Sequence, residues 1–144
     1  MRVARCVMTV VGAGVGLWLA TAAPKAHHAF LAEFDANQPI ELHGTVLKME
    51  WINPHSWMHM EVKRPDGKVE QWEVELGPPN ALFRRGWKQN SLPPGTAVVI
   101  QGYRAKDPKL MRVSGRDALL PDGRKLFMGS TDSGAPDFPK KPGA

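Results

Sequence analysis

The side chains best suited to chemistry in this chain are its histidines, which lie close together. His27, His28, His43, His55 and His59 fall within 33 residues, and no histidine follows His59. Methionines at positions 49, 58 and 60 lie in the same part of the chain. Imidazole suits Cu(II), and a thioether adds affinity for Cu(I). These residue types together raise the hypothesis of a copper site.

The stretch WINPHSWMHM is predicted to fold as part of a β-hairpin. Residues 53–54 are Asn-Pro, which favours a turn because proline fixes its own φ and keeps the preceding residue out of helical geometry. In the resulting register Met49 faces Met58, and Leu47 faces Met60. Methionine fills irregular gaps in a core. We therefore predict that the methionines pack in the interior rather than bind a metal.

The same register predicts an exposed pair on the outer face of the hairpin. His59 is placed opposite Lys48 and beside Trp57, and the lysine disfavours both a charged imidazole and a bound cation there. Trp57 and His59 are predicted as a surface binding pair of the kind that stacks on a sugar or peptide. The alternative is that Phe30 and Phe34, or the returning strand, cover Trp57.

His27, His28 and His55 are the candidate metal ligands, with copper as the metal. His55 lies by the turn, and it meets the paired histidines if the N-terminal arm folds across that end of the hairpin. Signal cleavage after Ala26 would make His27 the first residue, whose amine and imidazole chelate one copper ion together. Cleavage after Ala22, which fits the pattern better, removes that chelate. The alternative interpretation is a solvated arm without metal.

No pattern in the sequence predicts a catalytic residue. Glu70, Glu73 and Glu75 are interpreted as a solvated strand face, since nothing beside them predicts a raised carboxyl pKa. Ser56 and Ser91 have no acid or base at a recognisable spacing, and no glycine loop that binds phosphate is present. The chain is therefore predicted to be non-enzymatic.

The first 22 residues have the pattern of a secretory signal peptide. Arg2 and Arg5 precede an apolar run, and small residues follow it at positions 20–23. The alternative is an uncleaved membrane anchor. Cys6 lies in this segment, so the mature chain has no cysteine for a disulfide or a thiolate metal site. We predict a periplasmic or secreted protein with no membrane span in its mature form.

The mature chain is weakly basic. It keeps 17 lysines and arginines against 14 aspartates and glutamates, a net charge of +3 with neutral histidines. The two signs are interspersed, which suits solubility and gives no reason to expect a nucleic-acid partner. The expected partner is an unknown small ligand or an envelope protein, and the sequence carries no signal for an oligomeric state.

Hydrophobic patterning predicts a mainly β domain. Strands are expected at residues 40–51, 56–63, 68–76, 96–105, 110–113, 116–120 and 124–128. Asn80 is the expected N-cap of a short helix in which Leu82, Phe83 and Trp87 share a face. The adjacent apolar residues Val46 and Leu47 predict a bulge near residues 44–47, after which Leu47 belongs to the apolar face. This order predicts a small OB-like β-barrel of five to seven strands, with one short helix between the third and fourth strands. An open β-sandwich is the alternative.

The chain is thus divided into four predicted parts. They are a signal peptide at residues 1–22, an N-terminal arm at 23–38, an OB-like barrel at 39–128 and a disordered tail at 129–144. The tail assignment follows from its few apolar residues.

Six short motifs are spread over nearly the whole mature chain. They are HHAF at 27–30, EFD at 33–35, GTV at 44–46, EWINPHSW at 50–57, GW at 86–87 and DGRKLF at 122–127. Their combination resembles an uncharacterised family of small exported bacterial proteins, the domain-of-unknown-function family 6152. The resemblance implies a periplasmic OB-like β-barrel, and it brings no established activity, substrate or catalytic residue. The family pattern has a serine after the paired histidines, where this chain has Ala29, so no role of that hydroxyl carries over.

The sequence therefore predicts an exported binding or accessory module of the bacterial cell envelope, with an unknown ligand. The alternative function is periplasmic copper binding by the N-terminal histidine pair.

Overall fold

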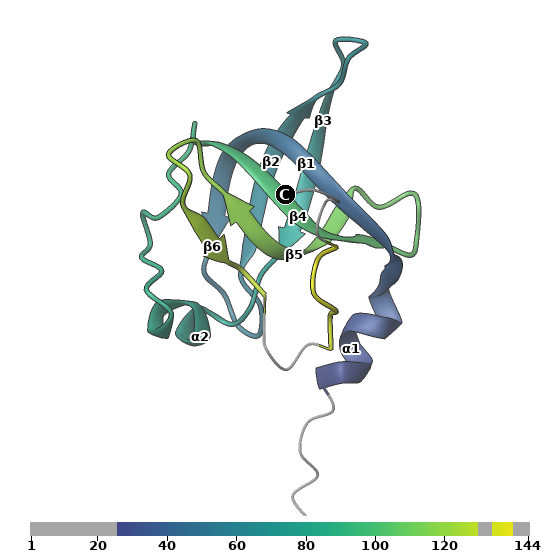
Figure 1. Ribbon diagram of the computed structural model, residues 1–144, viewed down its shortest axis with the longest axis vertical. Helices are drawn as coiled ribbons and strands as arrows, with labels where there is room; N and C mark the ends of the chain where they lie inside the picture. The colour runs from purple at the N-terminus through teal and green to yellow at the C-terminus, as the bar shows by residue number, and fades with distance from the viewer. Residues whose placement is uncertain (1–25, 130–133, 140–144) are drawn as a thin grey trace, which may run out of the picture.

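The computed structural model describes residues 26–129 and 134–139, with the side chains of 26–29 excepted. The elements in chain order are α1 (Ala26–Glu33), β1 (Phe34–Glu50), β2 (Trp57–Lys63), β3 (Val69–Glu75), α2 (Pro79–Arg84), β4 (Ala97–Ala105), β5 (Arg112–Leu119) and β6 (Lys125–Phe127) (Figure 1). The expected mainly β fold class is confirmed, and the short helix α2 lies between the third and fourth strands as predicted.

The strands close into a ring. The sheet has the order β3-β2-β1-β4-β5-β6, and β3 also pairs with β5 in parallel through residues 73–75 and 112–114. The long strand β1 makes this closure possible, because residues 39–45 pair with β4 while residues 45–50 pair with β2. Figure 1 shows β1 curving across the molecule between these two partners. The closed ring fits the predicted OB-like barrel.

A β-bulge interrupts β1 in the region where the sequence predicts one. The register shifts between Val46 and Lys48, so Val46 pairs with Met60 and Leu47 is the extra residue. Leu47 is 36% exposed, and the prediction that it faces Met60 in the core is wrong. The reason is that the extra residue of a bulge is left unpaired and the strand bends around it. Beyond the bulge the predicted pairing of Met49 with Met58 is confirmed.

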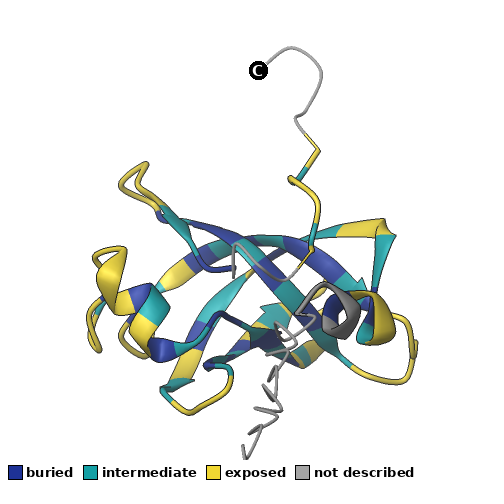
Figure 2. Cartoon of the chain, turned by 90° about the horizontal axis from the view of Figure 1, so that it is seen from below, coloured by how far each residue is buried: buried dark blue, intermediate teal, exposed yellow. Residues whose placement is uncertain are grey.

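Aliphatic side chains, methionines and tryptophans fill the interior of the ring. Met58 and Met60 are fully buried, as predicted, and they belong to the same core as Trp72 and Val74 on the neighbouring strand. Figure 2 shows buried residues along the strands, whereas exposed residues lie mainly in the loops and at the hairpin tip. The remaining buried residues of this core are Leu42, Val46, Leu76, Leu82, Trp87, Leu92, Val98, Ile100, Val113, Ala118, Leu120 and Met128.

The helix α2 begins earlier and is shorter than expected. Pro78 occupies the N-cap position, so Asn80 lies inside the helix rather than at its cap. The chain leaves the helix after Arg84, because Gly86 has a positive φ of 91° that other residues rarely adopt. Trp87 therefore lies beyond the helix, where its Nε1–H donates to the carbonyl of Phe127 at 2.9 Å. The expected helical face that includes Trp87 does not form.

The two short strands expected at residues 110–113 and 116–120 are one strand, β5. The intervening Gly115 pairs with Gly102 of β4. A Cβ atom on Gly102 would lie 2.2 Å from the carbonyl oxygen of Ser114. The two glycines therefore permit a close approach of the strands, rather than marking a strand end.

The ends of the chain are described only in part. The predicted signal peptide, residues 1–22, lies outside the described residues. No helix within the described ranges is long and apolar enough to cross a membrane. Residues 134–139 of the predicted tail contact the strands, since the Tyr103 hydroxyl donates to the carbonyl of Asp137 at 2.8 Å.

Candidate functional site

A cavity of about 250 Å³ lies between α1 and the strands β2, β3 and β5. Its walls carry aromatic rings, an imidazole, carboxylates, a guanidinium and several glycines. The lining residues are Phe30, Glu33, Phe34, His55, Trp57, Glu75, Leu76, Gly77, Ser114, Gly115, Arg116, Gly129 and Ala135. Mixed apolar walls with a few polar groups are typical of a small-ligand site.

An aromatic cluster fixes α1 against the strands and so forms one wall of this cavity. The Phe30 ring stacks on Phe34 with centroids 5.8 Å apart, and it meets the Tyr103 ring edge-on at 5.7 Å. All three rings are buried. Such ring pairs add stability beyond the apolar area that they bury. The helix is therefore docked by its own apolar side chains.

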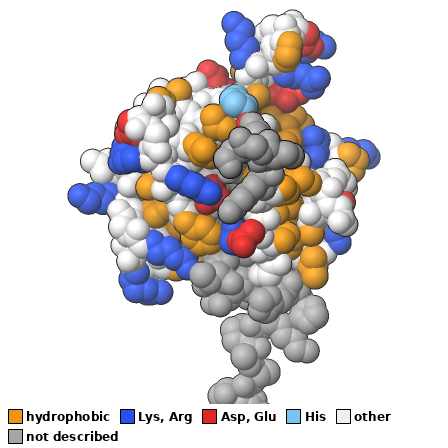
Figure 3. All heavy atoms as spheres, viewed as in Figure 1, with side chains coloured by type: hydrophobic (Ala, Val, Ile, Leu, Met, Phe, Trp, Pro, Cys, Tyr) orange, Lys and Arg blue, Asp and Glu red, His pale blue; other side chains and the backbone are white. Residues whose placement is uncertain are grey.

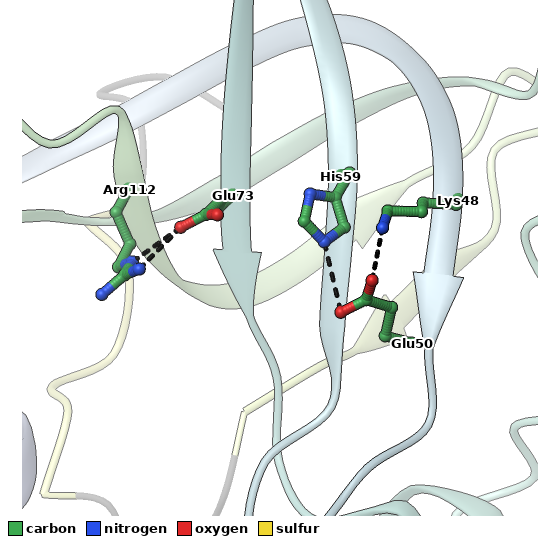
Figure 4. Close-up of polar contacts among 5 residues, drawn as sticks. All are labelled: Lys48, Glu50, His59, Glu73 and Arg112. Carbon is green, nitrogen blue, oxygen red and sulfur yellow. Dashed lines mark hydrogen bonds and ion pairs between the residues drawn. The ribbon is translucent and has the colours of Figure 1, made fainter.

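Arg112 ties the end of α1 to the strand β3. Its NH1 donates to Glu33 Oε1 at 2.8 Å, while NH2 and Nε donate to Glu73 Oε2 at 2.7 and 3.0 Å. Figure 4 shows the guanidinium directed at Glu73. The Arg112 Cζ atom also lies 4.9 Å from the centre of the Trp57 ring, within cation–π range. One arginine thus connects α1, β3 and the aromatic wall.

His55 and Glu75 form an ion pair in the cavity wall. The contact joins His55 Nδ1 to Glu75 Oε1, and the Glu75 side chain is only 13% exposed. The hydrogen bond with Glu75 raises the pKa of the His55 imidazole above its usual value, although partial burial opposes this. The second carboxylate oxygen, Glu75 Oε2, is buried and has no hydrogen-bond partner among the described residues.

The local backbone explains why His55 meets Glu75. After the Asn53-Pro54 turn, the Ser56 N–H donates to the carbonyl of Gly77 at 3.2 Å, and the Leu76 N–H donates to the carbonyl of Ser56 at 2.8 Å. These bonds extend the pairing of β2 with β3, in which Trp57 lies opposite Glu75. His55, the residue before Ser56, is thus held beside the end of β3.

A second group of polar side chains lies further along the outer face of β2. His59 Nε2 is 3.4 Å from Glu50 Oε2, which is within ion-pair range but long for a hydrogen bond. Lys48 also contacts Glu50, and the lysine and then the histidine hold the pKa of Glu50 below its usual value (Figure 4). His59 lines a separate cavity of about 240 Å³ with Leu47 and Leu110.

The predicted surface pair is divided between these two cavities. Trp57 and His59 point to the same face of β2, but Trp57 lines the cavity under α1 and His59 lines the other. Trp57 is half-buried, and Arg112 lies over its ring. Phe30 and Phe34 line the same cavity as Trp57. Binding by the pair remains a prediction.

The candidate metal ligands are described only in part. His55 lies in the cavity wall. The side chains of His27 and His28 lie outside the described residues, whereas their backbone forms the first turn of α1. No three His, Cys, Asp or Glu side chains in the described ranges lie close enough together to hold a metal ion. The structure thus brings His55 to the cavity that α1 lines.

Sequence reasoning did not identify Glu75 and Arg112 as site residues. The signal for Glu75 was available, because the hairpin register of β2 and β3 places it opposite Trp57. Arg112 carried no such signal, since it reaches the site through the parallel pairing of β3 with β5. That pairing joins segments far apart in the chain, which local patterning does not report.

Charged side chains of both signs are interspersed on the face of the molecule drawn in Figure 3. On the face drawn in Figure 3, lysines and arginines alternate with acidic and hydrophobic side chains, without a broad patch of one sign. A nucleic-acid interface is typically a basic patch or stripe. The surface on this face therefore agrees with the weak net charge of the sequence.

Comparison with known proteins identifies one family. The model of a family described as "Family of unknown function (DUF6152)" matches residues 16–114, which is more than half of the chain. No curated protein and no solved structure matches the chain significantly.

Proposed function

This chain belongs to the DUF6152 family, and we propose that it is an exported, non-enzymatic binding module of the cell envelope. Its ligand site is the cavity between α1 and the strands β2, β3 and β5. The observation that carries this proposal is the mixed lining of that cavity, where aromatic rings from α1 and β2 face charged side chains from β3 and β5.

The size and chemistry of the cavity support a small ligand. At about 250 Å³ it is near the lower limit of typical small-molecule pockets. Phe30 and Trp57 supply apolar walls, while Glu75 and Arg116 supply polar groups of opposite sign. A compact molecule with both an apolar surface and hydrogen-bonding groups fits this lining.

A cavity-filling substitution tests the ligand site. Ser114 lines the cavity, so Ser114→Phe reduces its volume, whereas Ser114→Ala leaves the volume nearly unchanged and serves as the control. Thermal unfolding is measured with a defined panel of monosaccharides, amino acids and short carboxylic acids. We expect at least one compound to raise the melting temperature of the wild type and of Ser114→Ala, but not of Ser114→Phe. Equal shifts in all three proteins, or no shift with any compound, would contradict the proposal.

Export is the second part of the proposal. It is supported by the basic residues, apolar run and small residues at the N-terminus of the sequence. Cell fractionation and N-terminal sequencing of the mature protein test it. We expect periplasmic or secreted protein that begins at Ala23, or at His27 if cleavage follows Ala26. Recovery of a chain that still begins at Met1 would contradict it.

The second candidate function is copper binding by His27, His28 and His55. A specific observation favours it: His55 and two residues of α1, Phe30 and Glu33, line the same cavity. The helix that carries the paired histidines is thus packed beside His55. In this alternative the ligand of the module is the metal ion itself.

A further inference from the structure

An arginine in the wall of the cavity under α1 is paired with a carboxylate from the C-terminal end of the chain. Arg116 lines the cavity, and its side chain is 18% exposed. Its NH2 group donates to Asp137 Oδ1, and Asp137 belongs to the described residues 134–139. The Asp137 side chain is 92% exposed. A half-buried guanidinium of the cavity thus shares its charge with a carboxylate on the surface.

The guanidinium of Arg116 is held in place by β5 and β6 rather than by Asp137 alone. Its Cζ atom lies 4.7 Å from the centre of the Phe127 ring, within cation–π range. Phe127 pairs with Asp117, the residue after Arg116, and the Met128 N–H donates to the Arg116 carbonyl at 2.9 Å. A fixed guanidinium is preorganised for a carboxylate, which it binds through parallel N–H donors.

The backbone around Asp137 is fixed by contacts that do not involve its carboxylate. The Tyr103 hydroxyl donates to the Asp137 carbonyl at 2.8 Å, and the Phe138 ring lies 6.2 Å from the Tyr103 ring. Ala135 lines the cavity. An ion pair with a fully exposed partner contributes little to stability. The Asp137 side chain can therefore leave Arg116 while residues 134–139 stay in contact with the strands.

The acidic groups of the cavity wall are held more firmly than Asp137. Glu75 is paired with His55, and its side chain is 13% exposed. Glu33 accepts a hydrogen bond from Arg112 at 2.8 Å, and its side chain is 42% exposed. A cationic ligand would have to compete with these cations for Glu33 or Glu75. An anionic ligand would have to displace only the exposed carboxylate on Arg116, which is the easier exchange.

We propose that the cavity under α1 binds a small carboxylate with an apolar body, and that the ligand carboxylate takes the place of Asp137 on Arg116. This inference rests on the small-ligand function proposed above and names the class of the ligand. Phe30 and Trp57 line the same cavity and supply apolar surface for the ligand body. Asp137 acts as an internal competitor, which lowers the apparent affinity for the ligand.

Binding of benzoate and pentanoate to the full mature chain tests the ligand class. Benzamide and benzylamine are the neutral and cationic probes of similar size. Two-dimensional NMR follows the backbone amides of residues 114–116, which line the cavity. We expect at least one of the two carboxylates to shift these amides saturably, and both other probes to bind at least about tenfold more weakly. Equal binding of benzamide or benzylamine would show that Arg116 does not select the ligand, and the inference would be wrong.

Substitutions at the ion pair test the competition. Asp137→Asn removes the competing charge, so we expect it to tighten carboxylate binding about three- to fivefold. Arg116→Gln is expected to weaken binding at least about tenfold. Asp122 and Arg124 form a comparable surface pair outside the cavity lining. Asp122→Asn and Arg124→Gln are therefore the matched controls, and both should leave the affinity unchanged within about twofold.

The opposite signs of these effects separate binding from a loss of fold. The melting temperature of each variant without added compound shows whether it is folded. Because misfolding does not increase affinity, Asp137→Asn decides the competition even if Arg116→Gln is unstable. An unchanged or weaker affinity in Asp137→Asn would overturn the role assigned to Asp137.

The outcomes also distinguish this inference from the function on which it rests. If a monosaccharide raises the melting temperature of the wild type, while neither carboxylate binds to the wild type or to Asp137→Asn, the ligand class is wrong and the small-ligand function stands. If the carboxylates bind equally well to Ser114→Phe, they bind outside the cavity and the inference is wrong. If no compound of the panel and neither carboxylate binds, both proposals are wrong.

Discussion

Ser56 offers a sharp test of the packing beside the cavity, because its hydroxyl is fully buried and has no hydrogen-bond partner among the described residues. A buried polar group without a partner costs about 1 to 3 kcal/mol. Ser56→Ala removes that group and leaves a void of about one atom, which costs only ~0.3 kcal/mol. We therefore expect the substitution to raise the free energy of unfolding by about 1 kcal/mol, the opposite of the usual effect of a core substitution.

Urea unfolding followed by tryptophan fluorescence measures this change, with a thermal scan as a second measurement. A gain of about 1 kcal/mol corresponds to an increase in melting temperature of about 4 °C for a domain of this size. Ser91→Ala is the matched control with the opposite expected sign, since the Ser91 hydroxyl accepts the Lys88 N–H at 2.8 Å. Its removal should cost about 1 kcal/mol. If Ser56→Ala instead lowered the free energy of unfolding by about 1 kcal/mol or more, the hydroxyl would have a hydrogen-bond partner and the reasoning would be refuted.

Three further predictions concern α1, the aromatic cluster and the bend of β1. Arg112→Lys keeps the charge but loses the forked arrangement of N–H donors. We therefore expect the free energy of unfolding to fall by about 1 kcal/mol and amide hydrogen exchange in α1 to become faster. Unchanged exchange would show that the aromatic cluster alone holds the helix. Burial raises the pKa of Tyr103, the only tyrosine in the chain, above its usual value. The fold therefore favours the neutral phenol. The resulting contribution to the free energy of unfolding is complete below pH about 10, and it is lost as the pH rises through the pKa of Tyr103 in the folded protein. Absorbance at the phenolate band should show the raised pKa in the folded protein, and Tyr103→Phe should remove this part of the alkaline loss of stability; an ordinary pKa would contradict the burial argument. A Cβ atom on Gly44 would lie 2.2 Å from the carbonyl oxygen of Glu61. We therefore expect Gly44→Ala to lower the free energy of unfolding, measured in urea, by more than about 2 kcal/mol. A decrease of less than about 0.5 kcal/mol would show that β1 and β2 separate easily.

The sequence predicts the local parts of this fold well. The register of β1 with β2 follows from the Asn-Pro turn and from alternation, because both act over a few residues. The burial of Met58 and Met60 follows from the same register. The position of the bulge follows only approximately, since two adjacent apolar residues do not show which one leaves the core. The prediction that Leu47 faces the core is wrong for this reason.

The candidate site is less predictable, because distant segments of the chain build it. Glu33, Glu75 and Arg112 come from α1, β3 and β5. Their contacts depend on the closure of the ring and on the docking of α1 by Phe30. Neither feature leaves a periodic pattern in the sequence. Local patterning therefore identified His55 and Trp57 as candidates but not the residues that hold them in place.

The bulge in β1 also determines where the chain tolerates a change of length. Leu47 is the one residue of this stretch without a partner on β2, since Val46 pairs with Met60 and Lys48 with His59. Deleting Leu47 would leave both pairs intact and keep every following side chain on its present face. Deleting either paired neighbour would instead shift the strand by one residue, unless the bulge itself moved to absorb the change. Among related sequences, insertions and deletions within this strand are therefore expected to collect at the position of Leu47, where selection against them is weakest.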